Sequence, residues 1–398
     1  IPRKRSTIST ASPSSVRPGT PGGSPSAPAE RVAAPPRILL VGAGHAHMEL
    51  VRRARRFARA GVSLTLIDPD DFWYSGAAAG VLSGAEPVKR AFADAAGLAA
   101  TSGVRMVRGR VARIDLDAGA AVLDGGAREA FDIVSLNTGS RAGPAWLIDQ
   151  GATPVKPVSN YAAIRERVEA ARGRLSIVIV GAGSSGVEAA CALAALSRDL
   201  GAHPNVTLID PDGVLAGAPQ RARREAQAAL KARGVSLVTA EARTLRAGPS
   251  GQVLELDRGR AAPCDLVIAA GGLSAALPEG LDDRLADQDG LPVDETLRWR
   301  GDRRVFAAGD CAAIIGAPRP KLGVFGVKAA PVLMHNLIAA ATGRGSMKTY
   351  APQARWLSIL DLAHGEGLAL YGGLVRRGPL MLRLKRAIDA RFVKRYRT

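Results

Sequence analysis

The chain has 398 residues, of which 47% are hydrophobic and only 4% aromatic. This length leaves room for two domains with sizeable cores, and the composition is ordinary for a soluble α/β protein. The sequence has no run of about 18 apolar residues, so we expect no transmembrane helix.

The formal net charge of +18 is concentrated at the two ends of the chain. Residues 1–37 and residues 375–398 together supply +13, so the body is only mildly basic. Neither end has a motif typical of nucleic-acid binding, which we therefore do not expect. A basic end without such a motif favours an anionic membrane surface or simple solvation.

The three cysteines, Cys191, Cys264 and Cys311, lie far apart in the sequence. No CxxC, CxxxxC or Cys/His cluster is present, so we expect neither a zinc site nor a redox pair at short spacing. Cys191 shares a helical face with small apolar residues, which favours a packed core residue over a reactive thiol.

Residues 1–36 are rich in Ser, Pro, Gly and Thr and carry scattered Arg. Such a segment buries too little apolar surface to fold. Two interpretations stay open, a disordered tail and an organelle transit peptide.

The stretch Ile38–Arg53, ILLVGAGHAHMELVRR, reads as strand, glycine turn and helix. A turn through Gly42 and Gly44 lets the backbone approach a pyrophosphate at a helix N-terminus. Asp68 ends the next apolar run, 24 residues after Gly44, near the offset at which an acid meets an adenosine ribose. His47 stands where the third glycine of the fingerprint is expected, and we expect it to be a packed helix residue.

The next segments read as a loop with a short helix, then short strands. Residues 71–84, DFWYSGAAAGVLSG, place Tyr74 either near a cofactor or in the core. Residues 103–136 read as short strands, and the last of them leads to Thr138 and Gly139 at a strand end. That position suits close contact with a ligand.

A second and more complete fingerprint lies in LSIVIVGAGSSGVEAACAL, with Gly181, Gly183 and Gly186 at GxGxxG spacing. A following strand ends at Asp210, again 24 residues past the last glycine, so we expect a dinucleotide site. Asp210 and the absence of an adjacent Arg favour NADH over NADPH, because the acid would repel a 2′-phosphate.

The two fingerprints belong to an internal repeat. DIVSLNTG at 132–139 and DLVIAAGG at 265–272 share the form DxVxxxxG. The interval from Gly42 to Gly139 is 97 residues and that from Gly181 to Gly272 is 91, and each holds a basic meander. We therefore predict an α/β fold with two similar nucleotide-binding domains.

The last third of the chain continues the pattern. A strand ends at Gly309-Asp310, and a helix is expected from about Val324 to Thr342. A glycine-broken hairpin follows, and then a basic amphipathic helix after Pro379. Its expected apolar stripe comprises Met381, Leu384, Ile388 and Phe392.

The paired fingerprints, the two DxVxxxxG strands and the late VFAAGD strand resemble the flavin-dependent pyridine nucleotide oxidoreductases. The blocks VGAGHAHMEL, YSGAAAG, RPKLGVFGVKAAPVLMHNL and LKRAIDARFVKRY look most like the type II NADH dehydrogenases, or NADH:quinone oxidoreductases. Within them they resemble the branch found fused to selenide, water dikinase and among demethylphylloquinone reductases. The likeness covers about residues 37–398.

This resemblance implies that FAD is held near the first turn and the strand ends, at Gly42, Gly44, His45, Asp68, Thr138, Gly139, Gly309 and Asp310. The N-terminus of the 324–342 helix, at Gly323 and Val324, would face the flavin and stabilise negative charge there. NADH would be held by Gly181, Gly183, Gly186 and Asp210. Glu188 resembles the acid near the nicotinamide, and its alternative is a helix-start acid favoured by the helix dipole.

The chain also departs from its relatives. The lack of CxxxxC disfavours a disulfide reductase, and Cys311 alone matches sulfide:quinone reductases poorly. Lys328 stands where relatives often have a Gln-bearing segment beside the quinone; it would stabilise an anionic flavin or quinol, or be a solvated residue.

The resemblance implies two-electron transfer from NADH through flavin to a quinone-type acceptor. Alternatives are a sulfide- or ferredoxin-type reductase and a non-enzymatic NADH-sensing flavoprotein. The basic helix, with Arg383, Lys385, Arg386 and Lys394 facing anionic lipid, would place the protein peripherally on the cytoplasmic face of a membrane, or in an organelle if residues 1–36 are a transit peptide. A packed or homodimer-forming helix is the alternative.

The expected organisation follows the repeat. An FAD-binding domain at 37–150 and 276–345 is interrupted by an NADH-binding domain at 151–275. Residues 346–398 form a C-terminal extension, and residues 1–36 form the tail.

Overall fold

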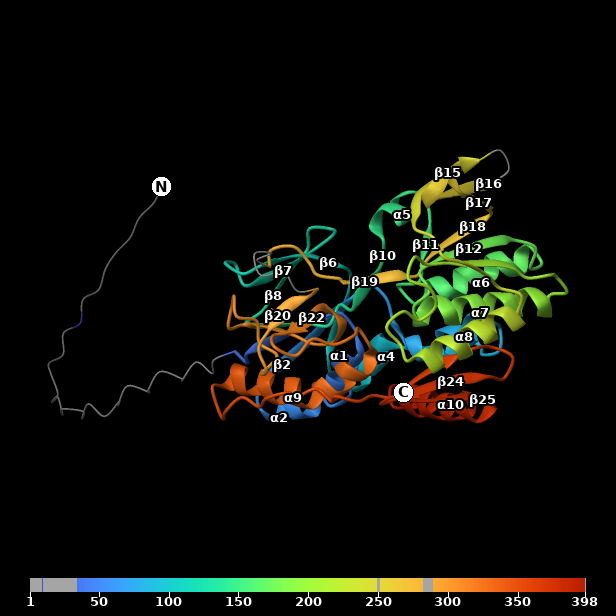
Figure 1. Ribbon diagram of the computed structural model, residues 1–398. Coiled ribbons are helices and arrows are strands. Elements are labelled where there is room, and N and C mark those ends of the chain that lie inside the picture. Colours follow the sequence, from blue (N-terminus) through green and yellow to red (C-terminus); the bar gives the residue numbers. More distant parts are fainter. Residues whose placement is uncertain (1–8, 10–33, 249–250, 282–288, 398) are drawn as a thin grey trace, which may run out of the picture. The chain divides into compact units, whose positions relative to one another are not determined.

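The computed structural model describes Ser9, residues 34–248, residues 251–281 and residues 289–397. The tail 1–36 therefore lies almost wholly outside the described residues. From Pro35 onward the chain forms one unit in which helices surround two parallel sheets, as Figure 1 shows.

The first sheet is a five-stranded parallel sheet with the order β21-β9-β1-β2-β5. Its strands are β1 (Arg37–Val41), β2 (Ser63–Asp68), β5 (Arg105–Arg108), β9 (Ile133–Leu136) and β21 (Val305–Ala307). The central strands β1 and β9 are almost entirely buried, as expected for continuous apolar runs covered on both faces.

The second sheet repeats this arrangement, with the order β11-β18-β12-β13-β14. Its strands are β11 (Thr153–Pro154), β12 (Ser176–Val180), β13 (Asn205–Ile209), β14 (Ser236–Val238) and β18 (Leu266–Ala269). In each sheet the strand before the glycine turn pairs with the strand that ends in an aspartate and with the DxVxxxxG strand. The predicted internal repeat is confirmed.

Helices connect and cover these strands. The first half contains α1 (His45–Arg52), α2 (Arg55–Arg59), α3 (Ala78–Leu82) and α4 (Ala95–Thr101). The second contains α5 (Ala145–Asp149), α6 (Asn160–Ala170), α7 (Ser184–Asp199) and α8 (Gln220–Ala232). Cys191 on α7 is fully buried, as predicted.

Each half also carries a three-stranded antiparallel sheet where the sequence shows a basic meander. These are β6 (Val111–Asp115), β7 (Ala120–Leu123) and β8 (Arg128–Ala130), and β15 (Ala242–Gly248), β16 (Gly251–Leu256) and β17 (Ala261–Cys264). The two halves are joined by an antiparallel pair, β10 (Ser140–Gly143) and β19 (Gly271–Ala275). Two small pairs are β3 (Phe72–Trp73) with β4 (Phe92–Ala93), and β20 (Leu291–Val293) with β22 (Ala312–Ile314).

The predicted helix near 324–342 is α9 (Gly323–Thr342). Among the described helices it is the one long and apolar enough to cross a membrane, although half of its apolar window is buried. It packs against α1, and Leu333 and Leu337 lie fully buried in the core around the first sheet. That packing accounts for its apolar character.

The C-terminal extension begins with a three-stranded antiparallel sheet in place of the predicted hairpin. Its strands are β23 (Ser358–Asp361), β24 (Gly367–Tyr371) and β25 (Leu374–Gly378), and they are followed by α10 (Pro379–Lys394). Figure 1 shows β24, β25 and α10 beside one another, in red.

The orientation of α10 differs from the prediction. Phe392 is buried, whereas Leu384 and Ile388 are exposed, so the four predicted residues do not form one stripe. Lys385, expected to face lipid, is buried because its Nζ donates to the Gly76 carbonyl and pairs with Asp389. The exposed apolar stripe consists of Leu380, Leu384 and Ile388.

Candidate functional site

The first glycine turn is held in place by the end of β9. Gly42 has a φ of +91°, and a Cβ there would come within 2.6 Å of the Asn137 carbonyl oxygen. The Asn137 side chain accepts hydrogen bonds from the Ala46 and His47 N–H groups, at 2.9 and 3.2 Å. Among the described residues, the N–H groups of Gly44 and His45 have no acceptor, so they remain for an anion at this helix end.

His47 explains why the third glycine is dispensable here. Its ring is fully buried; Nδ1 lies 2.7 Å from the Gly42 carbonyl oxygen and Nε2 lies 2.9 Å from Ser135 Oγ. Burial lowers the pKa of His47 to about 4, so the ring is neutral at physiological pH. The packing role predicted for His47 is confirmed. The hydrogen bonds of its ring hold α1 against the strands, where a third glycine would instead allow close contact between helix and strand.

The second turn has the close contacts that its full fingerprint predicts. Gly181 has a φ of +106°, and a Cβ on it would overlap Gly271. A Cβ on Gly186 would collide with the Gly181 carbonyl oxygen. Gly183 differs, because a Cβ there would meet nothing within 4 Å. No atom of the described residues requires a glycine at Gly183, whereas a pyrophosphate approaching the backbone would.

The two aspartates at the strand ends repeat the same hydrogen bonds. Asp68 accepts from the N–H groups of Ala43 and Asp70, at 2.5 and 2.8 Å. Asp210 accepts from the N–H groups of Ala182 and Asp212, at 2.7 and 2.9 Å. Each carboxylate thus ties its glycine turn to the next strand, and its remaining lone pairs suit a ribose hydroxyl.

Asp310 forms a charged centre at the end of β21. It accepts from Ser140 Oγ at 2.7 Å and from Lys156 Nζ at 2.9 Å. Burial would raise the pKa of Asp310, but the charge and hydrogen bond of Lys156 and the Ser140 hydroxyl hold it below the usual range. The carboxylate is therefore ionised and oriented.

Sequence reasoning missed Lys156, Asn137 and Lys321. Lys321 Nζ donates to the backbone oxygens of Asp289 and Asp310, at 2.8 and 2.7 Å. The partners of Lys156 and Asn137 lie 154 and 171 residues away along the chain, and no local pattern in the sequence marks such pairs.

At the strand ends beside Asp310 the backbone segments approach one another closely, as they do where a ligand contacts the backbone. Thr138 Oγ1 donates to the Ala276 carbonyl, and Gly139 precedes β10 with a positive φ. A Cβ on Gly309 would lie 2.6 Å from Asn137 Nδ2. The structure thus brings Thr138, Gly139, Gly309 and Asp310 together.

The N-terminus of α9 meets His45. A Cβ on Gly323 would lie 2.7 Å from His45 Nε2, and no side chain caps the start of this helix. Val324 is half-buried beside it, whereas Lys328, one turn further along α9, is exposed. Lys328 therefore lies on the same helix as Gly323 and Val324, with its side chain exposed.

Aromatic rings surround His45. Its ring centroid lies 5.1 Å from that of Phe72, 5.8 Å from Tyr74 and 5.5 Å from Phe392 of α10. Burial lowers the pKa of His45 to about 4, and the neighbouring Asp310 opposes this shift. A neutral His45 offers hydrogen bonds rather than charge.

Glu188 belongs to a buried polar cluster under α10. Its carboxylate accepts from the Asp361 N–H at 2.8 Å, and Tyr74 donates to Asp389 at 2.8 Å. Burial raises the pKa of Glu188 to about 7, and the charge of Lys385 acts against it. Glu188 therefore exchanges a proton near neutral pH, which a helix-start acid in solvent does not.

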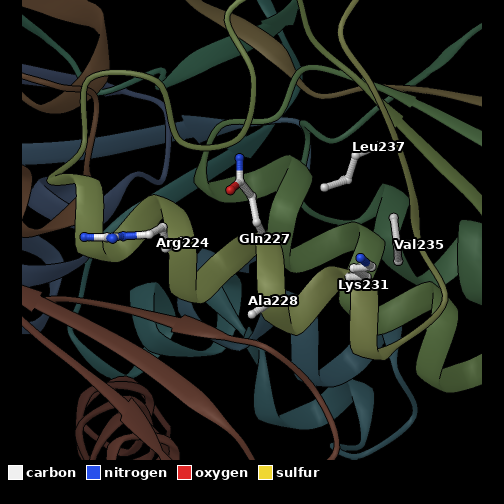
Figure 2. Close-up of a pocket in the computed structure, with 6 residues that line it drawn as sticks. All are labelled: Arg224, Gln227, Ala228, Lys231, Val235 and Leu237. Carbon is white, nitrogen blue, oxygen red and sulfur yellow. The ribbon is translucent and has the colours of Figure 1, made fainter.

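An open groove of about 500 Å³ lies away from both turns, between α8 and the edge strand β14 (Figure 2). It is lined by Arg224, Gln227, Ala228, Lys231, Val235 and Leu237. None of these residues belongs to the predicted site.

Both glycine turns lie within the segment that matches a known protein family. Residues 36–341 match the family described as "Pyridine nucleotide-disulphide oxidoreductase". The chain belongs to this family. The predicted fold class and activity, an FAD-dependent pyridine nucleotide oxidoreductase with two Rossmann-like domains, are confirmed.

Individual relatives are more distant. Ferroptosis suppressor protein 1 of Xenopus tropicalis is 26% identical over 85% of this chain and 89% of its own. An NADH dehydrogenase-like protein of Mycobacterium tuberculosis is 30% identical over 53% of this chain and 56% of its own. The crystal structure of sulfide:quinone oxidoreductase from Aquifex aeolicus has a TM-score of 0.74 at 16% identity and covers 91% of both chains.

The family name includes disulphide chemistry, for which this chain lacks the residues. Its three cysteines are all unpaired and buried. Cys311 lies next to Asp310 and is fully buried, with its sulfur 3.5 and 3.4 Å from the backbone oxygens of Leu136 and Ala308. This member therefore has no dithiol to pass electrons to.

Proposed function

We propose that the protein is an FAD-dependent NADH:quinone-type oxidoreductase. The observation that carries this proposal is the duplicated glycine turn, each copy tied to a strand-end aspartate, with the ionised Asp310–Lys156 pair beside the first copy. Resemblance to NADH dehydrogenase-like proteins supports it.

In this proposal the first half holds FAD through its turn and strand ends. The free N–H groups of Gly44 and His45 would face the pyrophosphate. The other residues proposed to hold FAD are Gly42, Asp68, Thr138, Gly139, Gly309 and Asp310. Lys156 keeps Asp310 ionised, so that it accepts hydrogen bonds from ribityl hydroxyls. The α9 N-terminus at Gly323 and Val324 would stabilise negative charge on the flavin ring.

The second half would hold NADH. Gly183 leaves the space for its pyrophosphate, Gly181 and Gly186 allow the turn to close, and Asp210 faces the ribose. When bound, the flavin would take a hydride from NADH and give two electrons to the acceptor. Glu188 lies one turn into α7. It is half-buried with a pKa of about 7, and it would hold or release a proton there. Lys328, exposed one turn along α9 from Val324, would stabilise an anionic flavin or quinol.

The acceptor is proposed to be a quinone reached from a membrane surface. The two faces of α10 support this: Phe392 packs against His45, while Leu380, Leu384 and Ile388 are exposed beside Arg383 and other cations. An amphipathic helix with an apolar stripe and basic flanks binds an anionic bilayer. The homodimer and a transit peptide at residues 1–36 stay hypotheses.

Steady-state oxidation of NADH tests the function. The FAD-loaded protein should oxidise NADH with a soluble quinone, and NADH alone should bleach the flavin absorbance near ~450 nm. Rapid bleaching without turnover of quinone, ferricyanide or ferredoxin would instead support an NADH-sensing flavoprotein. A protein that cannot be loaded with FAD would contradict the whole proposal.

A further inference from the structure

The nucleotide-recognition loop after β13 combines an acid and a cation. Asp210 directly follows the strand, and residues 211–219 lead to α8. Both Asp210 oxygens already accept backbone N–H groups, from Ala182 and Asp212. These bonds offset part of the carboxylate charge, so repulsion of a 2′-phosphate is weaker than the sequence alone suggests.

Arg223 brings a positive charge to the same loop. It lies in the first turn of α8, 13 residues after Asp210, and its side chain folds back over the loop. Nε donates to the Val214 carbonyl oxygen at 3.3 Å and Nη2 donates to the Asp212 carbonyl oxygen at 3.5 Å. A Cβ on Gly213 would lie 3.9 Å from Arg223 Nη2. The guanidinium is thus fixed against three consecutive residues of the loop.

The guanidinium keeps donors to spare. An arginine has five N–H groups, and the described residues provide acceptors for two of them. The remaining groups include both hydrogens of Nη1. A planar guanidinium with free N–H groups is the side chain best suited to a phosphate dianion.

We infer that Arg223 recognises the 2′-phosphate of NADPH, so that the site accepts NADPH as well as NADH. This inference rests on one part of the proposed function, namely that the Gly181–Gly186 turn binds a pyridine nucleotide. The ribose end of the two cofactors differs only in the 2′-substituent, so Arg223 sets the ratio between them. Arg223 acts in binding and takes no part in hydride transfer.

The neighbouring Arg224 is the matched control. It occupies the next position on α8, yet it lines the groove toward β14 shown in Figure 2 and makes none of the loop contacts of Arg223. Replacing either arginine removes one positive charge from the same helix. Only Arg223→Ala removes the charge at the loop.

The experiment measures binding by calorimetry to the FAD-loaded full chain, with NADP⁺, NAD⁺, 2′,5′-ADP and 5′-AMP as probes. We expect Arg223→Ala to weaken the binding of NADP⁺ and of 2′,5′-ADP about tenfold to a hundredfold. This is the range expected when a charge-assisted hydrogen bond is lost. NAD⁺ and 5′-AMP should stay within about twofold of the parent protein. Arg223→Lys should retain part of the affinity for NADP⁺, since lysine keeps the positive charge but lacks the paired N–H donors of the planar guanidinium.

Two results would overturn the inference: parent protein that binds NAD⁺ but not NADP⁺, or Arg223→Ala that weakens both nucleotides equally. Equal weakening would mean that Arg223 only shapes the loop. Arg224→Ala should leave all four affinities unchanged. If Arg224→Ala weakened NADP⁺ binding as much as Arg223→Ala does, the effect would come from the net positive charge of α8 and not from Arg223 itself. NADH oxidation is measured separately, so a protein that binds both nucleotides but oxidises neither would contradict the proposed function and leave Arg223 as the 2′-phosphate residue.

Discussion

The glycines of the second turn have different physical reasons for being glycine. Gly186 packs against the Gly181 carbonyl, whereas Gly183 faces open space with an ordinary φ of −68°. One position is therefore required by the fold, and the other is free to be required by a ligand. This separation makes a sharp test of the nucleotide site.

We predict opposite outcomes for two alanine variants of this turn. Gly183→Ala should change the free energy of unfolding by less than about 0.5 kcal/mol, because the new methyl meets no protein atom. It should weaken NADH binding about tenfold or more, since the methyl occupies the space of the pyrophosphate. Gly186→Ala should cost about 2 kcal/mol of stability through overpacking. Urea unfolding and NADH titration check both, and unaltered NADH binding by Gly183→Ala would contradict the assigned role.

Glu188 carries a second prediction at this scale, on pH. Burial raises its pKa to about 7 from 4.5, so the folded protein binds a proton that the unfolded chain has released. Stability from this group is therefore present below pH 4.5 and is lost as pH rises toward 7. Glu188→Gln cannot ionise, so relative to the parent it should gain about 3 kcal/mol between pH 4.5 and pH 8.

Urea unfolding at several pH values measures this gain. Asp124→Asn is the control, because Asp124 is exposed and its ion pair with Arg110 spans 3.8 Å. We expect the Asp124→Asn and parent curves to run parallel over the whole range. A parallel curve for Glu188→Gln as well would show that Glu188 is already ionised in the folded protein.

At the scale of elements, sequence patterns predicted the strands, turns and helices that depend on neighbouring residues. They missed the side-chain contacts that form only when the chain folds. Apolar runs and glycine spacing located both turns, both aspartate-ending strands and α9, since each depends on neighbouring residues. Lys156 was missed because its partner Asp310 lies 154 residues away along the chain. Arg223 was missed because helical periodicity does not show that its side chain folds back over the preceding loop. Helical periodicity found α10 but could not decide which face packs. Lys385 was therefore placed in lipid, although it is buried.

The corrected orientation of α10 sharpens the membrane prediction. Leu380, Leu384 and Ile388 are 65%, 43% and 43% exposed and follow one another at a spacing of four residues. Replacing all three with Gln should abolish flotation with anionic vesicles, because the apolar contact with the bilayer is lost. Oxidation of NADH with ferricyanide should remain, since none of the three packs against the site. Vesicle binding equal to that of the parent would remove α10 as the membrane contact.

At the scale of the molecule, the C-terminal extension joins two separate cores. Leu360, Leu368 and Val375 belong to the core around the second sheet. Phe392, Val393 and Tyr396 belong to the core around the first. The buried Lys385 lies between them on the chain, and its Nζ donates to the Gly76 carbonyl. The extension therefore couples the two halves through both apolar and polar contacts.

This coupling predicts how the molecule unfolds. Removing residues 379–398 takes Phe392 and Tyr396 from the first core, uncovers His45 and leaves Glu188 without the charge of Lys385. The second core keeps its own contacts with β23–β25, so the two halves should then melt separately. Calorimetry should show one transition for the full chain and two for the truncated one, with the half around the first sheet melting first. The Gln variant of Leu380, Leu384 and Ile388 is the control, because it leaves the packed face of α10 intact and should keep the single transition. A single transition in the truncated chain would mean that the remaining contacts couple the halves, namely the β10–β19 pair and the packing of α3 against α6 and α7.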